Sequence, residues 1–418
     1  MGTSTAPADG DLFSITDPAF QQCPFPHYAR MLADKPVWRD PVTGFWVVTR
    51  YDDVRAVLGN PQVWSSRADQ IFNRTSTVAQ EVKAIYEAEG WLPLDTLVSN
   101  DPPEHKRYRA LVDKALSPAK VSGIQGIIDA TVEDLTTRML EAGRLDFMRG
   151  FAIPLTMTML GNQIGGAKPE DIDQLRYWTE LQLEQINPVL APERELEITR
   201  EVVQFQQWLA RAIERVRAEP DGTILSNLAA AEIDGERLDT REVIAIATLF
   251  FGAGHDTTTS ALGSCVLYLA RRPDVLARLR EDPALVPNFV EEILRLEAPV
   301  QRLFRRALSD TSIEGVEIAA GEVVLIQYGG ANRDARKFEC PDELRPDRSD
   351  AARHLTFGAG IHFCVGNQLA RAELRTALAA IVRRCAAIEL ADGDSSYAYH
   401  EQFISRALSR LEIVVTAG

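Results

Sequence analysis

The chain has 418 residues, of which 45% are hydrophobic and 25% charged, a composition typical of a globular protein and not of a disordered or fibrous one. Lys and Arg number 45 against 60 Asp and Glu, and this net charge of −15 argues against a nucleic-acid-binding protein. The five cysteines are scattered, which excludes a disulfide framework or a paired-cysteine zinc site and favours a reducing cytoplasm.

The N-terminal segment predicts neither a signal peptide nor a membrane anchor. Residues 1–10 are small and polar, with no positively charged start and no apolar run. A length of 418 residues could hold two or three domains of about 150 residues, but no linker divides the sequence. We therefore expect residues 1–16 to be flexible and residues 17–418 to form a single domain.

The first third of the chain mixes a strand, helices and a long loop. Residues 45–49 are bulky and β-branched, which predicts a strand, and residues 51–58 change to helical spacing. Residues 67–97 show no clean period and predict a long loop with one short helix. In the helix that follows, His105 and Arg109 stand four apart on one face, where they could bind an anion or simply form a surface pair.

Three further helices are predicted in the middle of the chain. Residues 169–186 and 193–218 have amphipathic spacing and are joined by a proline-containing connector. A third helix starts at Asp239 or Thr240 and ends before Pro273. Its residues 243–254 carry no charge, yet they are too few to cross a membrane, so this helix should lie at the centre of the protein.

Polar residues follow this apolar run directly. Gly254 is followed after one residue by Asp256 and Thr257, which places a carboxylate and a hydroxyl where core is expected. Burying such groups costs a few kcal/mol unless they are paired or used. Three explanations stay open: the helix returns to solvent here, the hydroxyls bond back to the preceding turn, or these residues act on a ligand.

The last third contains a charged helix pair, a hairpin and a basic helix. Glu292 and Arg295 are three apart and could form an ordinary surface pair. Residues 313–327 alternate and predict a hairpin that turns at residues 320–321. The helix over residues 366–385 carries four arginines on an acidic chain, either as a solvated face or as a docking surface. These are Arg371, Arg375, Arg383 and Arg384.

Residues 357–366 read Phe-Gly-Ala-Gly-Ile-His-Phe-Cys-Val-Gly and form a glycine-rich loop around Cys364. Glycines at 358, 360 and 366 can take positive φ, so several backbone N–H groups could point at the sulfur and favour a thiolate. A single thiolate makes a poor structural zinc site but suits an axial bond to haem iron. The alternative is an ordinary buried cysteine in a turn.

This loop resembles the haem-binding signature of the cytochromes P450, whose fixed positions are Phe, Gly, His or Arg, Cys and Gly, and it matches all of them. The other motifs follow in the family order: His-x-x-x-Arg, Ala-Gly-x-Asp-Thr, Glu-x-x-Arg and Asn-Arg-Asp. The resemblance covers residues 17–418 and is closest to the soluble bacterial branch. It implies a mostly α fold with a minor β region, a triangular helical prism that holds haem b between a central distal helix and the helix after the cysteine loop.

The resemblance also implies how haem would be bound. Cys364 would be the axial thiolate ligand and the only residue bound to the metal, with Phe357 shielding the sulfur and Ala370 letting the next helix pack close to the ring. The remaining cofactor-binding residues would be His105, Arg109, Arg305 and His362 at the propionates, with Arg306 competing for the place of Arg305, and Gly358 and Gly366 in the loop.

The central helix would carry the oxygen chemistry. By the same resemblance, Gly254 would open a groove for dioxygen, Thr257 would hydrogen-bond the oxygen being reduced, and Asp256 would relay protons to it. Glu292 and Arg295 would meet Arg348 and brace the cysteine side of the haem. A peroxide-driven or isomerising haem enzyme would not need Asp256 and Thr257, and a haem sensor or carrier would be favoured only without them.

The implied function is a monooxygenase that hydroxylates or O-dealkylates a hydrophobic molecule. No flavin or iron–sulfur domain is recognisable in the sequence, so a separate ferredoxin or flavodoxin with its reductase would supply electrons, and NAD(P)H would be used indirectly. We expect a cytoplasmic monomer. Candidate residues of the substrate pocket are Trp91, Leu94, Leu97, Val98, Trp178, Leu249, Ala253, Leu303, Phe403 and Ile404.

Overall fold

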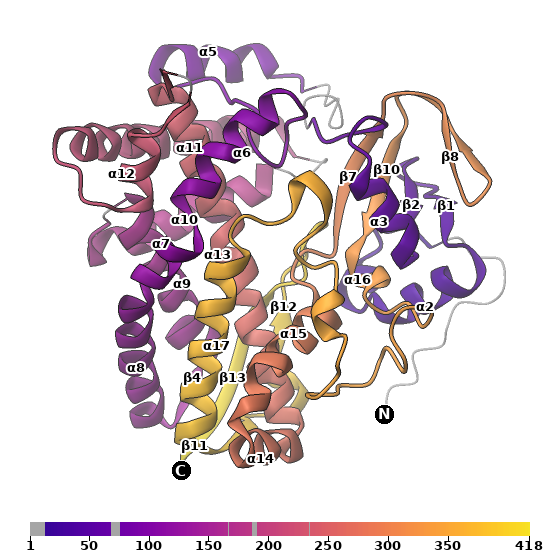
Figure 1. Cartoon of the computed structure of the whole chain (residues 1–418), viewed down its shortest axis with the longest axis vertical. Coiled ribbons are helices and arrows are strands. Elements are labelled where there is room, and N and C mark those ends of the chain that lie inside the picture. The colour runs from indigo at the N-terminus through magenta and orange to yellow at the C-terminus, as the bar shows by residue number, and fades with distance from the viewer. Residues whose placement is uncertain (1–12, 68–75, 166, 186–189, 234) are drawn as a thin grey trace.

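The computed structural model describes residues 13–67, 76–165, 167–185, 190–233 and 235–418. Helices make up most of the molecule, with one group of strands at one side and a second group among the helices near the C-terminus (Figure 1). The long helix α13 (Thr240–Arg271) runs through the helical part and contacts α17 (Asn367–Arg384), the helix that follows the cysteine loop. The expected fold class, mostly α with a minor β region, is confirmed.

Other helices surround this pair. Those before α13 are α1 (Pro18–Gln22), α2 (Phe25–Asp34), α3 (Tyr51–Gly59), α5 (Ala79–Glu89), α6 (Glu104–Ala115), α7 (Pro118–Gly123), α8 (Gln125–Ala142), α9 (Ile153–Leu160), α10 (Ile172–Gln185), α11 (Pro192–Ala218) and α12 (Ile224–Ala229). Those after it are α14 (Pro273–Glu281), α15 (Val286–Glu297) and α16 (Tyr328–Ala331). The connector between α10 and α11 lies partly outside the described residues.

The strands form two larger sheets and two short hairpins. One sheet has the order β1 (Val37–Arg39), β2 (Trp46–Val48), β10 (Val323–Gln327), β7 (Arg302–Ala307) and β3 (Trp64–Ser65). The other has the order β11 (Cys385–Leu390), β13 (Leu408–Ala417) and β12 (Tyr397–Tyr399), with β4 (Arg144–Asp146) also paired to β13. The hairpins are β5 (Glu232–Ile233) with β6 (Glu236–Arg237), and β8 (Thr311–Ile313) with β9 (Val316–Ile318).

The start and burial of α13 follow from its sequence. The Asp239 side chain accepts a hydrogen bond from Glu242 N at 2.8 Å, and the Glu242 carboxylate accepts one from Asp239 N at 2.9 Å. This reciprocal capping box satisfies two backbone donors that a helix start leaves unpaired. The uncharged run that follows is largely buried, with Val243 and Ile246 at 0% exposure. The helix therefore lies in the core, as its composition predicts.

Two local predictions are wrong. Residues 13–16 are packed rather than flexible, because Ile15 is fully buried and its N–H donates to the Asp40 carboxylate at 2.8 Å. The hairpin of β8 and β9 turns at Glu314 and Gly315, whose φ values of 50° and 76° suit a two-residue turn. Strand β10 pairs instead with β2 and β7, where its apolar side chains are buried on both faces.

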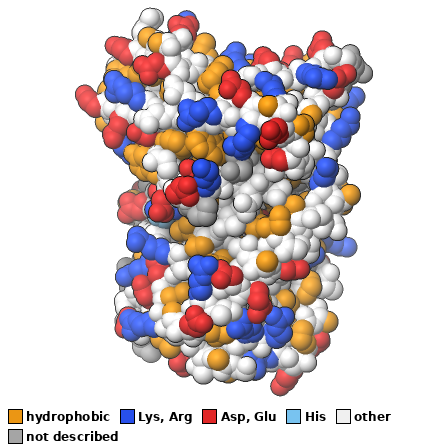
Figure 2. Space-filling view, turned by 90° about the vertical axis from the view of Figure 1, so that its left-hand side faces the viewer, with side chains coloured by type: hydrophobic (Ala, Val, Ile, Leu, Met, Phe, Trp, Pro, Cys, Tyr) orange, Lys and Arg blue, Asp and Glu red, His pale blue; other side chains and the backbone are white. Residues whose placement is uncertain are grey.

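Neither acidic nor basic side chains predominate on the face of the molecule that Figure 2 shows. Acidic and basic side chains are interspersed there, with small apolar areas between them (Figure 2). Within the described part of the chain, every helix is too short or too polar to cross a membrane.

Candidate active site

The loop before α17 folds tightly around Cys364. The Cys364 N–H donates to Phe357 O at 2.8 Å and closes the loop. Gly358 and Gly360 have φ values of 71° and 67°, as predicted, whereas Gly366 has φ −79° and needs no positive φ. Gly360 is also required by close packing, because a Cβ there would lie 2.4 Å from Leu58 O in α3.

The loop points backbone donors at the sulfur, but it does not make a thiolate by itself. Burial raises the pKa of the Cys364 thiol, and hydrogen bonds from the N–H groups of Gly366 and Asn367 oppose this only in part. Nearby Arg109 and Arg371 act in the same direction as these N–H groups. A bound metal ion deprotonates a coordinating thiol outright, so the same N–H groups would then stabilise the thiolate.

The shielding residue Phe357 is held on the helix side of the loop. The guanidinium of Arg371 lies 4.4 Å from the centre of its ring. The N–H of Ala370 donates to Gly366 O at 3.0 Å and forms the first turn of α17. Both residues therefore lie where the loop passes into the helix.

Basic side chains converge beside the loop from three elements. His105 of α6 and His362 of the loop have ring centres 4.4 Å apart, and His362 Nε2 lies 3.0 Å from the Ser66 hydroxyl. Arg109, one turn after His105, donates to Phe363 O and pairs with Asp113. Arg305 of β7 is 4% exposed and donates to Phe304 O at 2.6 Å.

Arg305, not Arg306, faces this cluster. Neighbouring residues of a strand point to opposite faces of the sheet. Arg306 donates to Gly321 O at 3.2 Å on the other face, whereas Arg305 lowers the pKa of His362. The choice that the sequence left open is therefore resolved by the sheet.

The cluster fits an anionic group such as the two haem propionates. Burial, Arg305, His105 and Arg109 together lower the pKa of His362 to about 3, and burial lowers that of Arg305. Buried His362 Nδ1 has no hydrogen-bond partner among the described residues. An anion here would accept a charge-assisted hydrogen bond from Arg305 and would favour the protonated form of His362.

The oxygen-chemistry residues lie within α13, which continues unbroken past them. The Thr257 hydroxyl donates to Ala253 O at 2.7 Å, and the Ser260 hydroxyl donates to Asp256 O at 2.6 Å. One of the three open explanations is thus decided, since the Thr257 hydroxyl does bond back to the preceding turn. The helix does not end here, although Ala253, one turn before Thr257, is exposed. Neither bond occupies the carboxyl group of Asp256.

The Asp256 carboxyl has a pKa close to neutral pH. Burial, together with the nearby charge of Glu180 in α10, raises the pKa of this carboxyl to about 6. A hydrogen bond from Ser405 opposes this rise. A group with such a pKa can hold or release a proton under ordinary conditions.

Gly254 lies against α9. A Cβ at this position would lie 3.1 Å from Leu160 Cδ2 of α9. Its lack of a side chain thus allows α9 and α13 to approach closely, an explanation that the sequence alone did not suggest.

The predicted brace is assembled in the core. Arg295 Nε donates to Glu292 Oε2 at 2.7 Å, and Arg348 Nε donates to Glu292 Oε1 at 2.9 Å. Glu292 and Arg295 are fully buried, which rules out an exposed surface pair.

Glu291 is a second buried acid that sequence reasoning passed over. It accepts hydrogen bonds from Arg371 Nε at 2.8 Å and Arg375 Nη2 at 2.9 Å, and it contacts His354 Nε2 at 3.3 Å. Burial would raise the pKa of Glu291, but hydrogen bonds from His354 and Arg371 outweigh it and hold the pKa low. Two adjacent acids between the apolar residues Val290 and Ile293 were the available signal.

The candidate pocket residues fall into separate groups. Trp91, Leu94, Leu97, Trp178 and Leu249 pack in one cluster with α11 and the first half of α13. Ala253 and Val98 are exposed, and Leu303 lies on the same face of β7 as Arg305. Phe403 and Ile404 pack instead beside the N-terminal segment, where Phe403 stacks on Phe304 at 5.9 Å. Because Phe304 is on the opposite face of β7 from Arg305, the expectation that this turn points into the pocket is wrong for Phe403.

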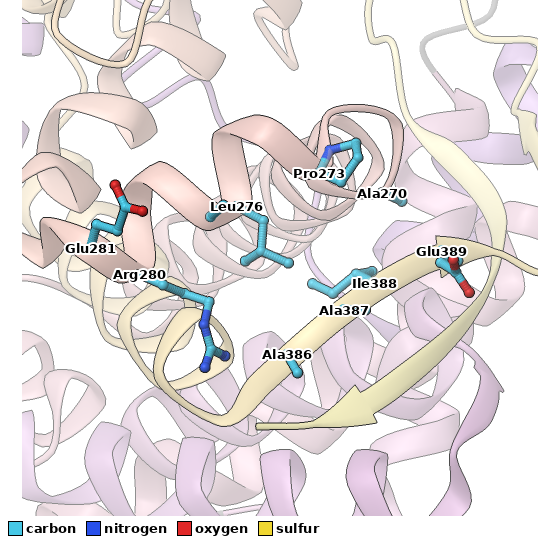
Figure 3. Close-up of a pocket in the computed structure, with 10 residues that line it drawn as sticks. Ala270, Pro273, Leu276, Arg280, Glu281, Ala386, Ala387, Ile388 and Glu389 are labelled. Atoms are coloured by element: carbon cyan, nitrogen blue, oxygen red, sulfur yellow. The ribbon is translucent and has the colours of Figure 1, made fainter.

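A surface groove of about 440 Å³ lies elsewhere, between α14 and β11. Leu276 and Ile388 face each other across it, with Arg280 and Glu281 toward one end and Glu389 at the other (Figure 3). Helix α17 begins just after the cysteine loop and ends at β11, and its 18 residues separate the two places by about 27 Å. The groove is therefore not part of the candidate site.

A lone cysteine in a closed loop, basic side chains gathered beside it, and a polar turn in a buried helix fit a haem-thiolate protein. The chain matches the family model for cytochrome P450 over residues 43–407. It is 34% identical over 410 residues to cytochrome P450 107B1 of Saccharopolyspora erythraea, covering 96% of this chain and 97% of that protein. It is 33% identical to vitamin D(3) 25-hydroxylase of Pseudonocardia autotrophica, covering 99% and 98%.

Solved structures of cytochromes P450 are also similar to this chain. Cytochrome P450 CYP109Q5 from Chondromyces apiculatus has a TM-score of 0.85 at 30% identity, with 97% of this chain and 98% of that chain covered. PksS of Bacillus subtilis, a P450 of bacillaene polyketide synthesis, also has a TM-score of 0.85, at 29% identity, with 97% of this chain and 100% of that chain covered. The chain belongs to the cytochrome P450 family. It is a haem-thiolate monooxygenase that binds haem b, incorporates oxygen from O2 and receives electrons from NAD(P)H only through redox-partner proteins.

Proposed function

We propose that this P450 hydroxylates or O-dealkylates a hydrophobic organic molecule. The observation that carries the proposal is the turn of α13 at Asp256 and Thr257, where a carboxyl with a pKa of about 6 adjoins a hydroxyl beside the exposed Ala253. Apolar candidate wall residues, among them Leu249 and Trp91, lie in the cluster that packs along the same helix. One relative is itself named as a hydroxylase of vitamin D(3).

The residues would divide the work as follows. Cys364 would hold the iron, and His105, Arg109, Arg305 and His362 would bind the propionates by charge-assisted hydrogen bonds. Bound haem supplies the redox chemistry that activates O2, with the thiolate favouring O–O cleavage.

Two side chains would control protons on the distal side. Asp256 would take up and release them at its carboxyl group, which the hydrogen bond from Ser405 orients. Thr257 would present its hydroxyl oxygen as an acceptor while its hydroxyl hydrogen is donated to Ala253 O, until a ligand competes for that hydrogen bond.

A separate ferredoxin or flavodoxin with its reductase is the proposed electron donor. Phe363, next to Cys364, is 39% exposed and offers an apolar contact at the edge of the loop. The four arginines of α17 are less available than their number suggests, because Glu291 holds Arg371 and Arg375, while Glu133 holds Arg383 and Arg384. The excess is 4 − 2 = 2 positive charges, which still favours an acidic partner.

We also propose a monomer in the cytoplasm. Support comes from the free cysteines, of which Cys23 and Cys340 are exposed and would stay reduced most readily in that compartment. Size-exclusion chromatography with light scattering measures the oligomeric state, and a dimer would contradict the monomer.

The decisive experiment measures product formed per NADH consumed, together with hydrogen peroxide, once a substrate has been identified by the low-spin to high-spin shift that it causes. Thr257→Ala should still bind substrate and consume NADH but divert much of it to peroxide, and Asp256→Asn should slow turnover. Wild-type coupling in both variants would show that these residues are structural. A peroxide-driven haem enzyme, or a haem protein without turnover, would then be the better assignment.

A further inference from the structure

One buried polar contact of α13 has no part in the function proposed above. His255 lies between Gly254 and Asp256, and its Nδ1 is 2.9 Å from the hydroxyl of Thr156 in α9. The same hydroxyl is 2.8 Å from that of Thr259, one turn further along α13. His255 and Thr259 are each 5% exposed and Thr156 is 1% exposed, so the three groups satisfy one another in the core.

The hydrogen bonds are consistent with a neutral imidazole. Burial, with a smaller contribution from Arg176 of α10, lowers the pKa of His255 to about 4. The Thr156 hydroxyl also lies 3.2 Å from the carbonyl oxygens of Ala152 and Ile153. It can therefore accept from Thr259 and from His255 while donating to its own helix.

The contact lies on the opposite side of α13 from the oxygen-chemistry turn. Successive residues of an α-helix are about 100° apart, so His255 and Thr257 point about 200° apart. The packing on the His255 side of the helix is close, since a Cβ at Gly263 would be 2.7 Å from Met148 Sδ. With the back of the helix held this closely, little rotation about its axis is possible without breaking the Thr156 bonds.

We propose that Thr156 and His255 are positioning residues, whose hydrogen bond fixes the rotation of α13 and thereby the direction in which Asp256 and Thr257 face. The proposal rests on the proposed function, since it assumes that the facing of Thr257 matters for coupling. It adds α9 as the element that sets this facing, and it gives Gly254 the role of letting α9 come close.

The test is Thr156→Val, which keeps the size of the side chain but removes the hydroxyl and leaves His255 Nδ1 and Thr259 Oγ1 with only their own longer contact of 3.4 Å in the core. Thr156→Ser retains the hydroxyl and should recover most of what the valine variant loses. Thr158→Val is the matched control, because it makes the same change on the same helix at a residue without a described hydrogen bond to α13.

The first measurement needs no turnover. Hydrogen–deuterium exchange of the ferric, haem-bound protein should be several-fold faster over residues 250–260 in Thr156→Val than in the wild type or in Thr158→Val. Unchanged exchange in this segment would show that apolar packing alone holds α13, and would overturn the proposal.

The second measurement is product per NADH at equal haem content. Thr156→Val should lower it at least two-fold with the substrate-induced spin shift kept, and should lower it little further in a Thr257→Ala background, because both changes act on one group. A loss of equal size in both backgrounds would mean that Thr156 acts elsewhere. If Thr257→Ala itself leaves coupling unchanged, the proposed relay fails, and the exchange result still decides whether Thr156 positions the helix.

Discussion

Replacing Glu373 should stabilise the protein in a pH-dependent way. Glu373 of α17 is 4% exposed, and its Oε2 has no hydrogen-bond partner among the described residues. Burial raises the pKa of this carboxyl to about 8 from the 4.5 that is usual for a glutamate side chain. The folded protein therefore keeps a proton that the unfolded chain releases above pH 4.5, and its stability falls as the pH rises between these two values.

The size of the effect follows from the two pKa values. At pH 7 the solution is 2.5 pH units above the pKa of 4.5 that Glu373 has in the unfolded chain. This difference corresponds to about 3 kcal/mol less free energy of unfolding than for a side chain that never ionises. Glu373→Gln keeps the shape and stays neutral, so it should be more stable than the wild type by roughly 2–3 kcal/mol at pH 7. The difference should shrink toward zero near pH 4 and become constant above pH 8.

Thermal unfolding of both proteins at matched haem content, in steps from pH 4.5 to 8.5, measures this difference as a rising gap in Tm of a few degrees. Glu389→Gln removes an exposed carboxylate and serves as the control, for which no widening gap is expected. A gap that does not change with pH, or a variant less stable than the wild type at pH 8, would refute the reasoning.

Three further predictions concern the site and its support. Arg305→Ala should speed haem transfer to apomyoglobin about ten- to hundred-fold, since one propionate loses a bond worth roughly 1.5–3 kcal/mol, and an unchanged rate would remove Arg305 from the clamp. Glu292→Gln should cost about 3–5 kcal/mol in urea unfolding because it leaves the buried charge of Arg295 uncompensated, and a loss below 1 kcal/mol would contradict the brace. Turnover should fall as the pH rises through about 6, where Asp256 loses its proton, and Asp256→Asn should flatten this profile. Glu180→Gln should move its midpoint to lower pH, because removing a nearby negative charge lowers the pKa of Asp256; an unmoved midpoint would show that Glu180 does not act on it.

The sequence was most informative where the chemistry is local. The Asp239 cap, the uncharged run after it and Pro273 predict α13 closely, since capping and proline effects act within one turn. The cysteine loop was likewise readable from its own ten residues. The exception within it, Gly366, shows that the presence of a glycine does not prove that its conformation is needed.

What the sequence did not show was which face of an element meets which neighbour. The resemblance gives Gly254 a role toward dioxygen, but no pattern in the sequence predicts its close contact with Leu160. Phe403 was assigned to the pocket, but it stacks on the far side of β7. Both depend on the packing of segments more than 90 residues apart, which spacing within one segment cannot encode.

The two ionic clusters of the core differ in a way that explains what haem adds to the fold. Around Glu292 each cation has an acid in contact, since Arg295 and Arg348 share the carboxylate. Around His362, Arg305 is a buried cation without an acid in contact among the described residues. The first cluster forms from the chain's own side chains whether or not haem is present. The second leaves Arg305 without a contacting anion until one binds, so haem binding should stabilise the folded chain by supplying the missing charges as well as by filling space.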